Sequence, residues 1–177
     1  VEANAAAFAG LSLGGVVTAC ASCASFLRTH YPGPLAETVT IEELLLQRLD
    51  DLPLATDPSL VVTYHRPCHL SRYLKVDPAE AILGRLGNYS ELPKQDVCCG
   101  GGGSFFVKNP DTAARIGERK AKNILAAGAE VVATSCPGCA FQLEASLARL
   151  GAGVRVVLLA ELVAASLASK DTFPERV

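Results

Sequence analysis

The sequence contains no methionine, and it lacks the features of a membrane-spanning or exported chain. Its longest apolar run, Val156 to Ala168, is interrupted by Glu161 and is too short to span a bilayer. The N-terminus has no basic segment followed by an apolar stretch, which excludes a signal-peptide pattern. Without an initiator methionine, we expect that the chain was cut from a longer one or that its start was trimmed.

The chain also lacks an excess of charge of either sign. Its formal net charge is −2 at pH 7, which argues against a nucleic-acid binder held by phosphate contacts. Hydrophobic residues make up 50% and charged residues 19%, so a large buried core is expected and disorder is not. A length of 177 residues corresponds to one large domain or to one and a half small ones.

The chain also lacks an even number of cysteines, since it has seven. A secreted disulfide scaffold is usually smaller, richer in loops and even in its cysteine count. Here the cysteines interrupt alternating strand and helix patterns instead. This combination predicts a cytoplasmic protein whose thiols bind a metal or take part in redox chemistry.

Strand patterns alternate with helix patterns through most of the chain. Such alternation predicts an α/β fold with parallel sheets and right-handed crossovers. Gly and Pro residues, with Asp or Asn before Pro, mark the helix ends. The predicted strands are 60–64, 131–134 and 154–159, and the predicted helices are 77–87, 109–128, 137–150 and 161–168.

An internal repeat relates the two ends of the chain. The segment VVTACASCASFL at 16–27 aligns with VATSCPGCAFQL at 132–143, a shift of 116 positions that places Cys20 and Cys23 on Cys136 and Cys139. We therefore expect pseudo-duplicated Rossmann-like units, of which the first is incomplete. Residues 1–56 would be the C-terminal part of the first repeat, and residues 57–177 the complete second repeat.

Five cysteines of the second repeat form three groups along the chain. Each group is expected just after a strand or at the start of a helix, and parallel strands end at one edge of their sheet. We therefore expect the five thiolates to converge on one crevice. They are Cys68, Cys98, Cys99, Cys136 and Cys139.

The local spacing of these cysteines suits metal or cluster binding. A CxxC that opens a helix sets both sulfurs beside free N–H groups, which lowers thiol pKa. The adjacent pair Cys98-Cys99 needs a twisted backbone to reach one centre, because neighbouring strand side chains point to opposite sides. Gly100 to Gly103 can supply positive φ and leave room for a bulky centre. A multi-metal centre can use adjacent thiolates on different metal atoms, which a single tetrahedral ion rarely needs.

The pattern C-x29-CCG-x35-CxxC, with PCHLSR around Cys68, resembles the cysteine-rich CCG domain found in the family of heterodisulfide reductase B-type subunits. That family includes the iron–sulfur subunits of glycolate oxidase and of lactate-utilisation oxidoreductases, and its members usually carry two such domains in tandem. The resemblance implies an electron-transferring domain in which the same five cysteines hold a [4Fe–4S] cluster of non-cubane type. The first repeat keeps only Cys20 and Cys23, and the ferredoxin motif CxxCxxCxxxCP is missing. The chain is therefore expected to be a C-terminal fragment with a partial second site at Cys20 and Cys23.

For the whole protein, the resemblance implies an oxidoreductase subunit of a 2-hydroxy-acid (glycolate or lactate) complex. It would pass electrons between a flavin-containing subunit and a membrane-associated acceptor or a disulfide, with other iron–sulfur subunits as partners. It would work in the cytoplasm or, through its partners, at the inner face of the membrane. A cluster-dependent disulfide reductase subunit and a zinc-stabilised interaction domain stay open, and the motif marks no catalytic residue.

Simpler interpretations of the same residues also stay open. Structural zinc is the main rival for the five cysteines, ahead of buried structural thiols. The CPGC turn lacks the flanks of a thioredoxin-like site, and no Lys-Ser/Thr follows the glycines as in a phosphate-binding loop. His65 and His69 either pack near the turn or hydrogen-bond a cluster sulfur. We expect four cations to form the solvated face of a helix, or alternatively a docking patch. They are Arg115, Arg119, Lys120 and Lys122.

Overall fold

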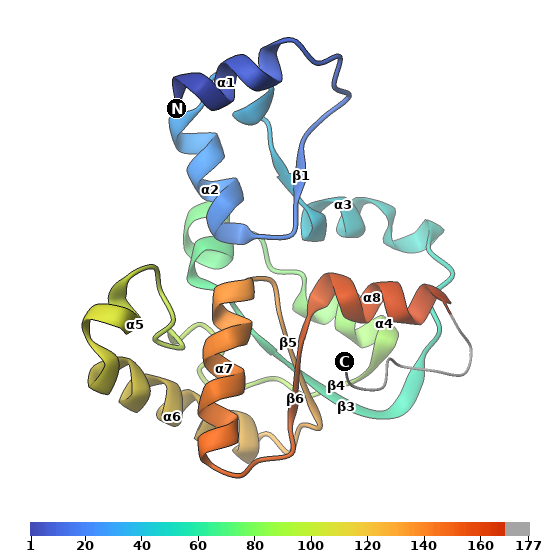
Figure 1. The fold of residues 1–177 in the computed structure, drawn as a ribbon. Helices are drawn as coiled ribbons and strands as arrows, with labels where there is room; N and C mark the ends of the chain where they lie inside the picture. The colour runs from blue at the N-terminus through green and yellow to red at the C-terminus, as the bar shows by residue number, and fades with distance from the viewer. Residues whose placement is uncertain (169–177) are drawn as a thin grey trace.

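The computed structural model describes residues 1–168 and contains two parallel sheets, which confirms the predicted α/β class (Figure 1). Residues 169–177, which belong to the predicted second repeat, lie outside the described part of the chain. The larger sheet has the strand order β4-β3-β5-β6, and the smaller sheet pairs β1 with β2. The strands are β1 (Val17–Thr18), β2 (Val39–Thr40), β3 (Asp57–His65), β4 (Gly87–Tyr89), β5 (Val131–Thr134) and β6 (Arg155–Leu158).

The central strands β3 and β5 of the larger sheet end side by side. His65, the last residue of β3, pairs with Thr134, the last residue of β5. The chain leaves β3 for β4 on one side and leaves β5 for β6 on the other. The strand order therefore reverses between β3 and β5, and open α/β sheets bind their ligands at the carboxyl ends of the strands at such a switch point.

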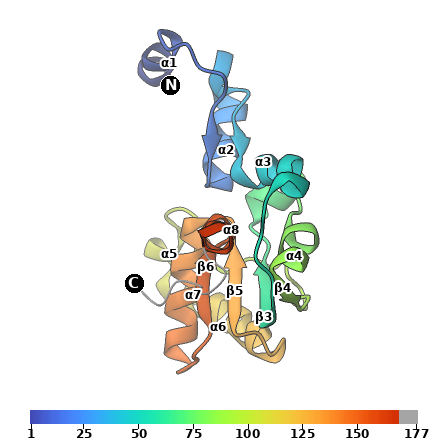
Figure 2. The same ribbon diagram turned by 90° about the vertical axis from the view of Figure 1, so that its right-hand side faces the viewer.

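Helices cover both faces of the larger sheet. Val131 and Ala133 of β5 pack in a core with the helices η4 (Ala79–Leu83), α4 (Gly84–Leu86) and α8 (Leu159–Ala168). Val132 points to the opposite face, where it packs with α6 (Pro110–Ala126) and α7 (Pro137–Arg149). Figure 2 shows α7 and α4 on opposite sides of the sheet. Among residues 1–168, no helix combines the length and the apolar character needed to cross a bilayer.

The observed element ends follow the Pro and Gly signals closely. Helix α6 begins at Pro110 and stops before Gly128, which has a φ of 67° in the left-handed region. Strand β5 occupies the predicted residues. The predicted helix 77–87 differs in its interior, because it consists of the π-helical η4 followed by the single turn α4. It still ends at Gly87, where an added Cβ would lie 2.9 Å from the Leu60 carbonyl oxygen of β3.

Residues 17–48 repeat the element order of residues 131–168. Strand β1 leads through a CxxC turn into α2 (Ala21–His30), and β2 leads directly into α3 (Ile41–Arg48). Cys20 caps α2 with φ −128° and ψ 107°, and Cys136 caps α7 with φ −148° and ψ 116°. The two cysteine turns therefore have matching shapes, as the internal repeat predicts. The division into two domains at residue 56 stays a prediction. The short helix α1 (Glu2–Ala9) precedes these elements.

Polar contacts join the first cysteine turn to the carboxyl edge of the larger sheet. Glu42 of α3 is 1% exposed and interacts with Ser135, whose hydroxyl oxygen lies 2.7 Å from the Tyr64 hydroxyl oxygen. The Ala21 backbone N–H donates to the Ser135 carbonyl across 3.4 Å. Burial raises the pKa of Glu42, and it also raises that of Tyr64. These contacts hold the Cys20–Cys23 turn beside the residue that precedes Cys136.

Candidate metal centre

Three segments carry cysteines to the switch point of the larger sheet. Cys68 follows β3 and caps the π-helix η3 (His69–Leu74). Cys136 follows β5 and caps α7, and Cys139 lies in the first turn of that helix. The pair Cys98-Cys99 comes from the long loop after β4 and not directly from a strand end, which corrects the expectation for this group. All seven cysteines of the chain are free thiols.

Four of the cysteines form a chain of interacting thiols. Cys98 interacts with Cys99, and Cys99 in turn interacts with Cys139, whose Sγ lies within 4.8 Å of its own. Cys139 also interacts with Cys136, and Cys68 interacts electrostatically with Cys98. Four of the five predicted cysteines therefore lie together at this edge of the sheet, and Cys68 interacts with one of them.

Interactions among these four thiols lower the pKa values of two of them, Cys99 and Cys136. The hydrogen bond from Cys139 holds the pKa of Cys99 well below its ordinary value, although burial acts in the opposite direction. The neighbouring Cys139, together with backbone N–H groups at the start of α7, lowers the pKa of Cys136 to about 6. The pKa of each donor thiol, Cys139 and Cys98, is raised because its proton bonds a neighbouring thiolate. Thiolates, the form that binds metals, are thus favoured at Cys99 and Cys136.

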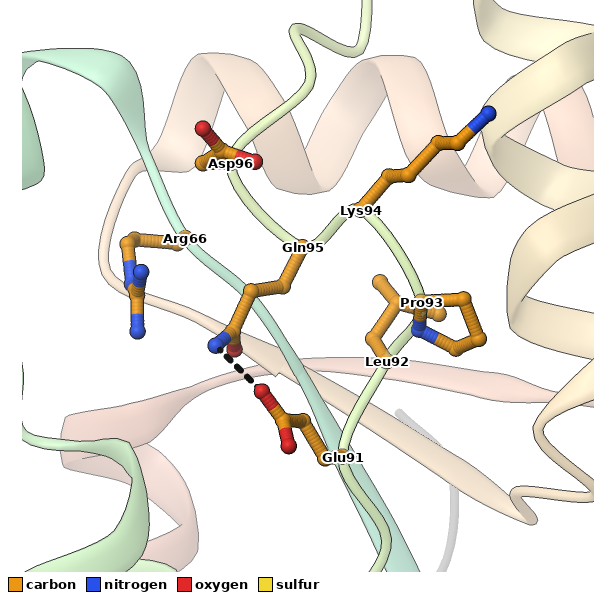
Figure 3. A pocket seen from close by; sticks show the side chains of 7 residues that line it. All are labelled: Arg66, Glu91, Leu92, Pro93, Lys94, Gln95 and Asp96. Atoms are coloured by element: carbon orange, nitrogen blue, oxygen red, sulfur yellow. Dashed lines mark hydrogen bonds between the residues drawn. The ribbon is translucent and has the colours of Figure 1, made fainter.

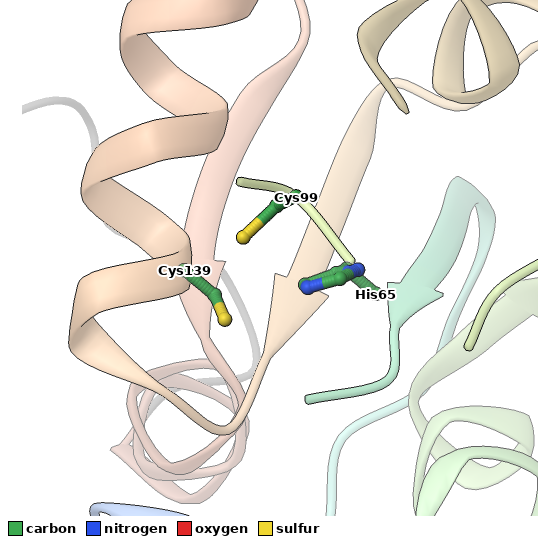
Figure 4. A group of neighbouring side chains, drawn as sticks. All are labelled: His65, Cys99 and Cys139. Carbon is green, nitrogen blue, oxygen red and sulfur yellow. The ribbon is translucent and has the colours of Figure 1, made fainter. Parts of the chain in front are cut away.

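His65 points into the same space as two of these thiols (Figure 4). Its ring nitrogen and the Sγ atoms of Cys99 and Cys139 all lie within 4.8 Å of one another. The side chain is 1% exposed, and its Nδ1 has no hydrogen-bond partner among the described residues. Because buried polar atoms are nearly always paired, this nitrogen fits a site that a metal centre would complete.

His69 faces a different part of the crevice. Its Nδ1 lies 3.7 Å from the Cys68 Sγ and 3.2 Å from the Ser22 Oγ. Its ring stacks on Tyr73 with the centroids 5.1 Å apart. The two histidines that flank Cys68 in the sequence thus contact different cysteines, with His65 at Cys99 and His69 at Cys68.

The glycines after Cys99 give the loop its path beside α6 and α7. Gly100 has a φ of 88°, the positive value predicted for the turn, and its N–H donates to the Cys98 Sγ across 3.3 Å. An added Cβ on Gly101 would lie 2.8 Å from the Gly138 carbonyl oxygen at the start of α7. The turn leaves Cys98 exposed and buries Cys99 at 1% exposure. The two neighbouring sulfurs therefore differ in environment.

The cysteine turn of the first repeat adjoins this crevice. Ser22, between Cys20 and Cys23, hydrogen-bonds the Cys136 thiol as well as His69. Cys20 interacts electrostatically with Cys136, and burial raises the pKa of Cys20 to about 11. The role of Ser22 could not be predicted, because the repeat aligns it with Gly138, which has no side chain to compare.

Lys120 contradicts the predicted solvated helix face. Arg115, Arg119 and Lys122 are exposed, whereas Lys120 is 1% exposed. Its Nζ donates to the carbonyl oxygens of Lys94 and Gln95, each at 2.9 Å. The physical reason is its position on the inward stripe of α6, which it shares with Ala113, Gly117, Ala121 and Ile124.

Comparison with known proteins identifies similar chains. The family model described as "CCG: Cysteine-rich domain" matches residues 62–144. A fumarate reductase (CoM/CoB) subunit of Methanothermobacter marburgensis is 34% identical over 92% of this chain and 34% of its own. A dihydromethanophenazine:CoB–CoM heterodisulfide reductase subunit of Methanosarcina acetivorans is 31% identical over 86% of this chain and 40% of its own. The probable glycolate oxidase iron–sulfur subunit of Bacillus subtilis is 29% identical over 90% of this chain and 40% of its own.

The matched family segment begins in β3 and ends in α7, so it contains all five cysteines of the crevice. The chain spans between 34% and 40% of the length of these three relatives.

Proposed function

We propose that the cysteine site of this chain, whose residues 62–144 match the CCG cysteine-rich domain family model, holds an iron–sulfur cluster and passes electrons within an oxidoreductase complex. The observation that supports the proposal is the chain of interacting thiols, in which the Sγ atoms of Cys99 and Cys139 lie within 4.8 Å of each other and of a His65 ring nitrogen. Five sulfurs exceed the four ligands of a tetrahedral ion, whereas a polynuclear centre can use all of them.

The proposed cluster is of the [4Fe–4S] class and of non-cubane type, with Cys68, Cys98, Cys99, Cys136 and Cys139 as its ligands. The different environments of Cys98, which is exposed, and Cys99, which is buried, support this assignment, because the two sulfurs can then bind different metal atoms. When bound, such a cluster takes up and releases single electrons. His65 would donate a hydrogen bond to a sulfur of the centre, and Gly101 would keep the loop close to α7.

For the whole protein, we propose an iron–sulfur subunit of a glycolate or lactate oxidoreductase complex. The name of the Bacillus subtilis relative, an iron–sulfur subunit of glycolate oxidase, supports this choice. The proposed partners are a flavin-containing subunit, other iron–sulfur subunits and a membrane-associated acceptor. The name of the Methanosarcina acetivorans relative favours a second candidate, a subunit of a disulfide reductase.

Zinc is the alternative occupant, and one observation favours it. His65, Cys99 and Cys139 place three ligand atoms within 4.8 Å of one another, a spacing that suits a single ion. Zinc would stabilise the fold without any redox chemistry. The two occupants therefore differ in whether the purified chain can accept electrons.

The proposal predicts a coloured, reducible chain after anaerobic reconstitution with iron and sulfide. Visible charge-transfer absorbance should appear, bleach with dithionite and return on stepwise oxidation. A reconstituted chain that shows neither colour nor electron uptake would contradict electron transfer by this domain. Turnover of a disulfide by the assembled complex, compared with oxidation of glycolate or lactate, separates the two oxidoreductase candidates.

A further inference from the structure

The buried lysine of α6 supports the loop that carries Cys98 and Cys99. Its two hydrogen bonds, to the Lys94 and Gln95 carbonyl oxygens, lie a few residues before the cysteine pair. Gln95 also accepts a hydrogen bond from the Arg66 backbone N–H, at 3.3 Å. Figure 3 shows this loop from Glu91 to Asp96 beside Arg66. The loop is thus held from α6 on one side and from the end of β3 on the other.

The loop needs this support because its backbone is strained. Lys94 has a φ of 56°, in the left-handed region that residues with a Cβ rarely adopt. A charged donor on the Lys94 carbonyl is stronger than a neutral one, and burial of the Lys120 side chain keeps water from competing. The ammonium therefore helps to fix the path by which the chain reaches Cys98.

The Lys120 ammonium also interacts electrostatically with the cysteines of the proposed centre. Burial lowers the pKa of Lys120 to about 8, while the negative charges of Cys99 and Asp96 act in the opposite direction. Lys120 also lowers the pKa of His65 by charge repulsion, although burial of the imidazole is the larger cause. A buried cation thus interacts electrostatically with the Cys99 thiolate, and water screens it little.

We propose that Lys120 is a positioning residue that fixes the Cys98-Cys99 loop and raises the reduction potential of the centre. This inference rests on the proposed function, because it requires a centre that accepts electrons. When the centre takes one electron from a reductant such as dithionite, no bond breaks and its net charge falls by one. A fixed neighbouring cation stabilises this more negative state more than the oxidised one.

The test compares Lys120→Met and Lys120→Gln with the wild-type chain, each reconstituted anaerobically. Glutamine keeps a side-chain N–H donor on a stem one methylene shorter and removes the charge, whereas methionine removes both the donor and the charge. Lys122→Met is the matched control, since Lys122 is on the same helix, is exposed and pairs with Glu118 at 2.6 Å. Iron content and the midpoint potential are measured, with circular dichroism to check folding.

We expect both Lys120 variants to shift the midpoint potential to more negative values and Lys122→Met to leave it unchanged. Lys120→Met should also bind less iron than Lys120→Gln, because its loop is no longer held. If Lys120→Met does not fold, the midpoint potential of Lys120→Gln alone tests the inference. A reducible wild-type chain with the same potential in the folded Lys120 variants overturns this inference alone. A wild-type chain without a reducible centre overturns the proposed function and this inference together.

Discussion

Replacing Cys99 by serine is expected to remove nearly all iron from the reconstituted chain. Cys99 lies in the middle of the thiol chain, where it interacts with both Cys139 and Cys98, and it is 1% exposed. A serine hydroxyl keeps its proton at neutral pH, so it cannot replace a thiolate ligand. Cys98→Ser should also reduce iron content strongly, because the proposed centre uses both neighbouring sulfurs. Iron and acid-labile sulfide, assayed after anaerobic reconstitution, measure both effects.

The first-repeat cysteines provide the controls for this experiment. Cys20 and Cys23 belong to the first repeat, and neither is among the five ligands of the proposed centre. Cys20→Ser and Cys23→Ser should therefore bind iron at nearly the wild-type level. Loss of the centre in Cys20→Ser, or full iron content in Cys99→Ser, would show that the ligands have been assigned to the wrong cysteines.

Gly101→Ala is expected to destabilise the fold and to lower iron content together. The added methyl group would lie 2.7 Å from the Gln142 Cβ and 2.8 Å from the Gly138 carbonyl oxygen, closer than Cβ atoms approach in proteins. Relief requires the loop to move away from α7, which separates Cys99 from Cys139. We expect a loss of about 1–3 kcal/mol in the free energy of unfolding. Denaturant unfolding of the metal-free chain and iron analysis after reconstitution measure the two effects.

Gly102→Ala is the matched control for this substitution. A Cβ at Gly102 would meet nothing within 4 Å, and its backbone does not require the left-handed region. Its stability and its iron content should therefore remain close to those of the wild-type chain. Equal behaviour of the two alanine variants would contradict the role given to the contact between Gly101 and α7.

The α/β fold could be predicted where local signals and tertiary packing agree. The β-branched run of β5 and the Pro and Gly ends of α6 specify their elements locally, and both are observed as predicted. Strand β4 has the sequence Gly-Asn-Tyr, which carries no strand pattern of its own. This strand forms because it pairs in parallel with β3, where Val62 is the partner of Tyr89. That information is in the tertiary structure and not in the local sequence.

The candidate site shows the same division between local and tertiary information. The family model confirms the resemblance to the CCG domain. This resemblance could be predicted because the spacing of the five cysteines is itself a sequence pattern. Lys120 was expected in solvent because it stands among other cations, although its helical spacing from Ala113 and Gly117 places it on the buried stripe. Ser22 and Glu42 could not be predicted at all, since both act across the contact between the two repeats.

The most direct test of the account is the metal content of the anaerobically reconstituted chain. One cluster bound by the five cysteines predicts about four iron ions and about four sulfides per chain, with zinc absent. The iron and sulfide content per chain should be the same with and without partner subunits, because all five proposed ligands belong to this chain. About one zinc ion per chain with no iron would contradict the proposed electron-transfer centre.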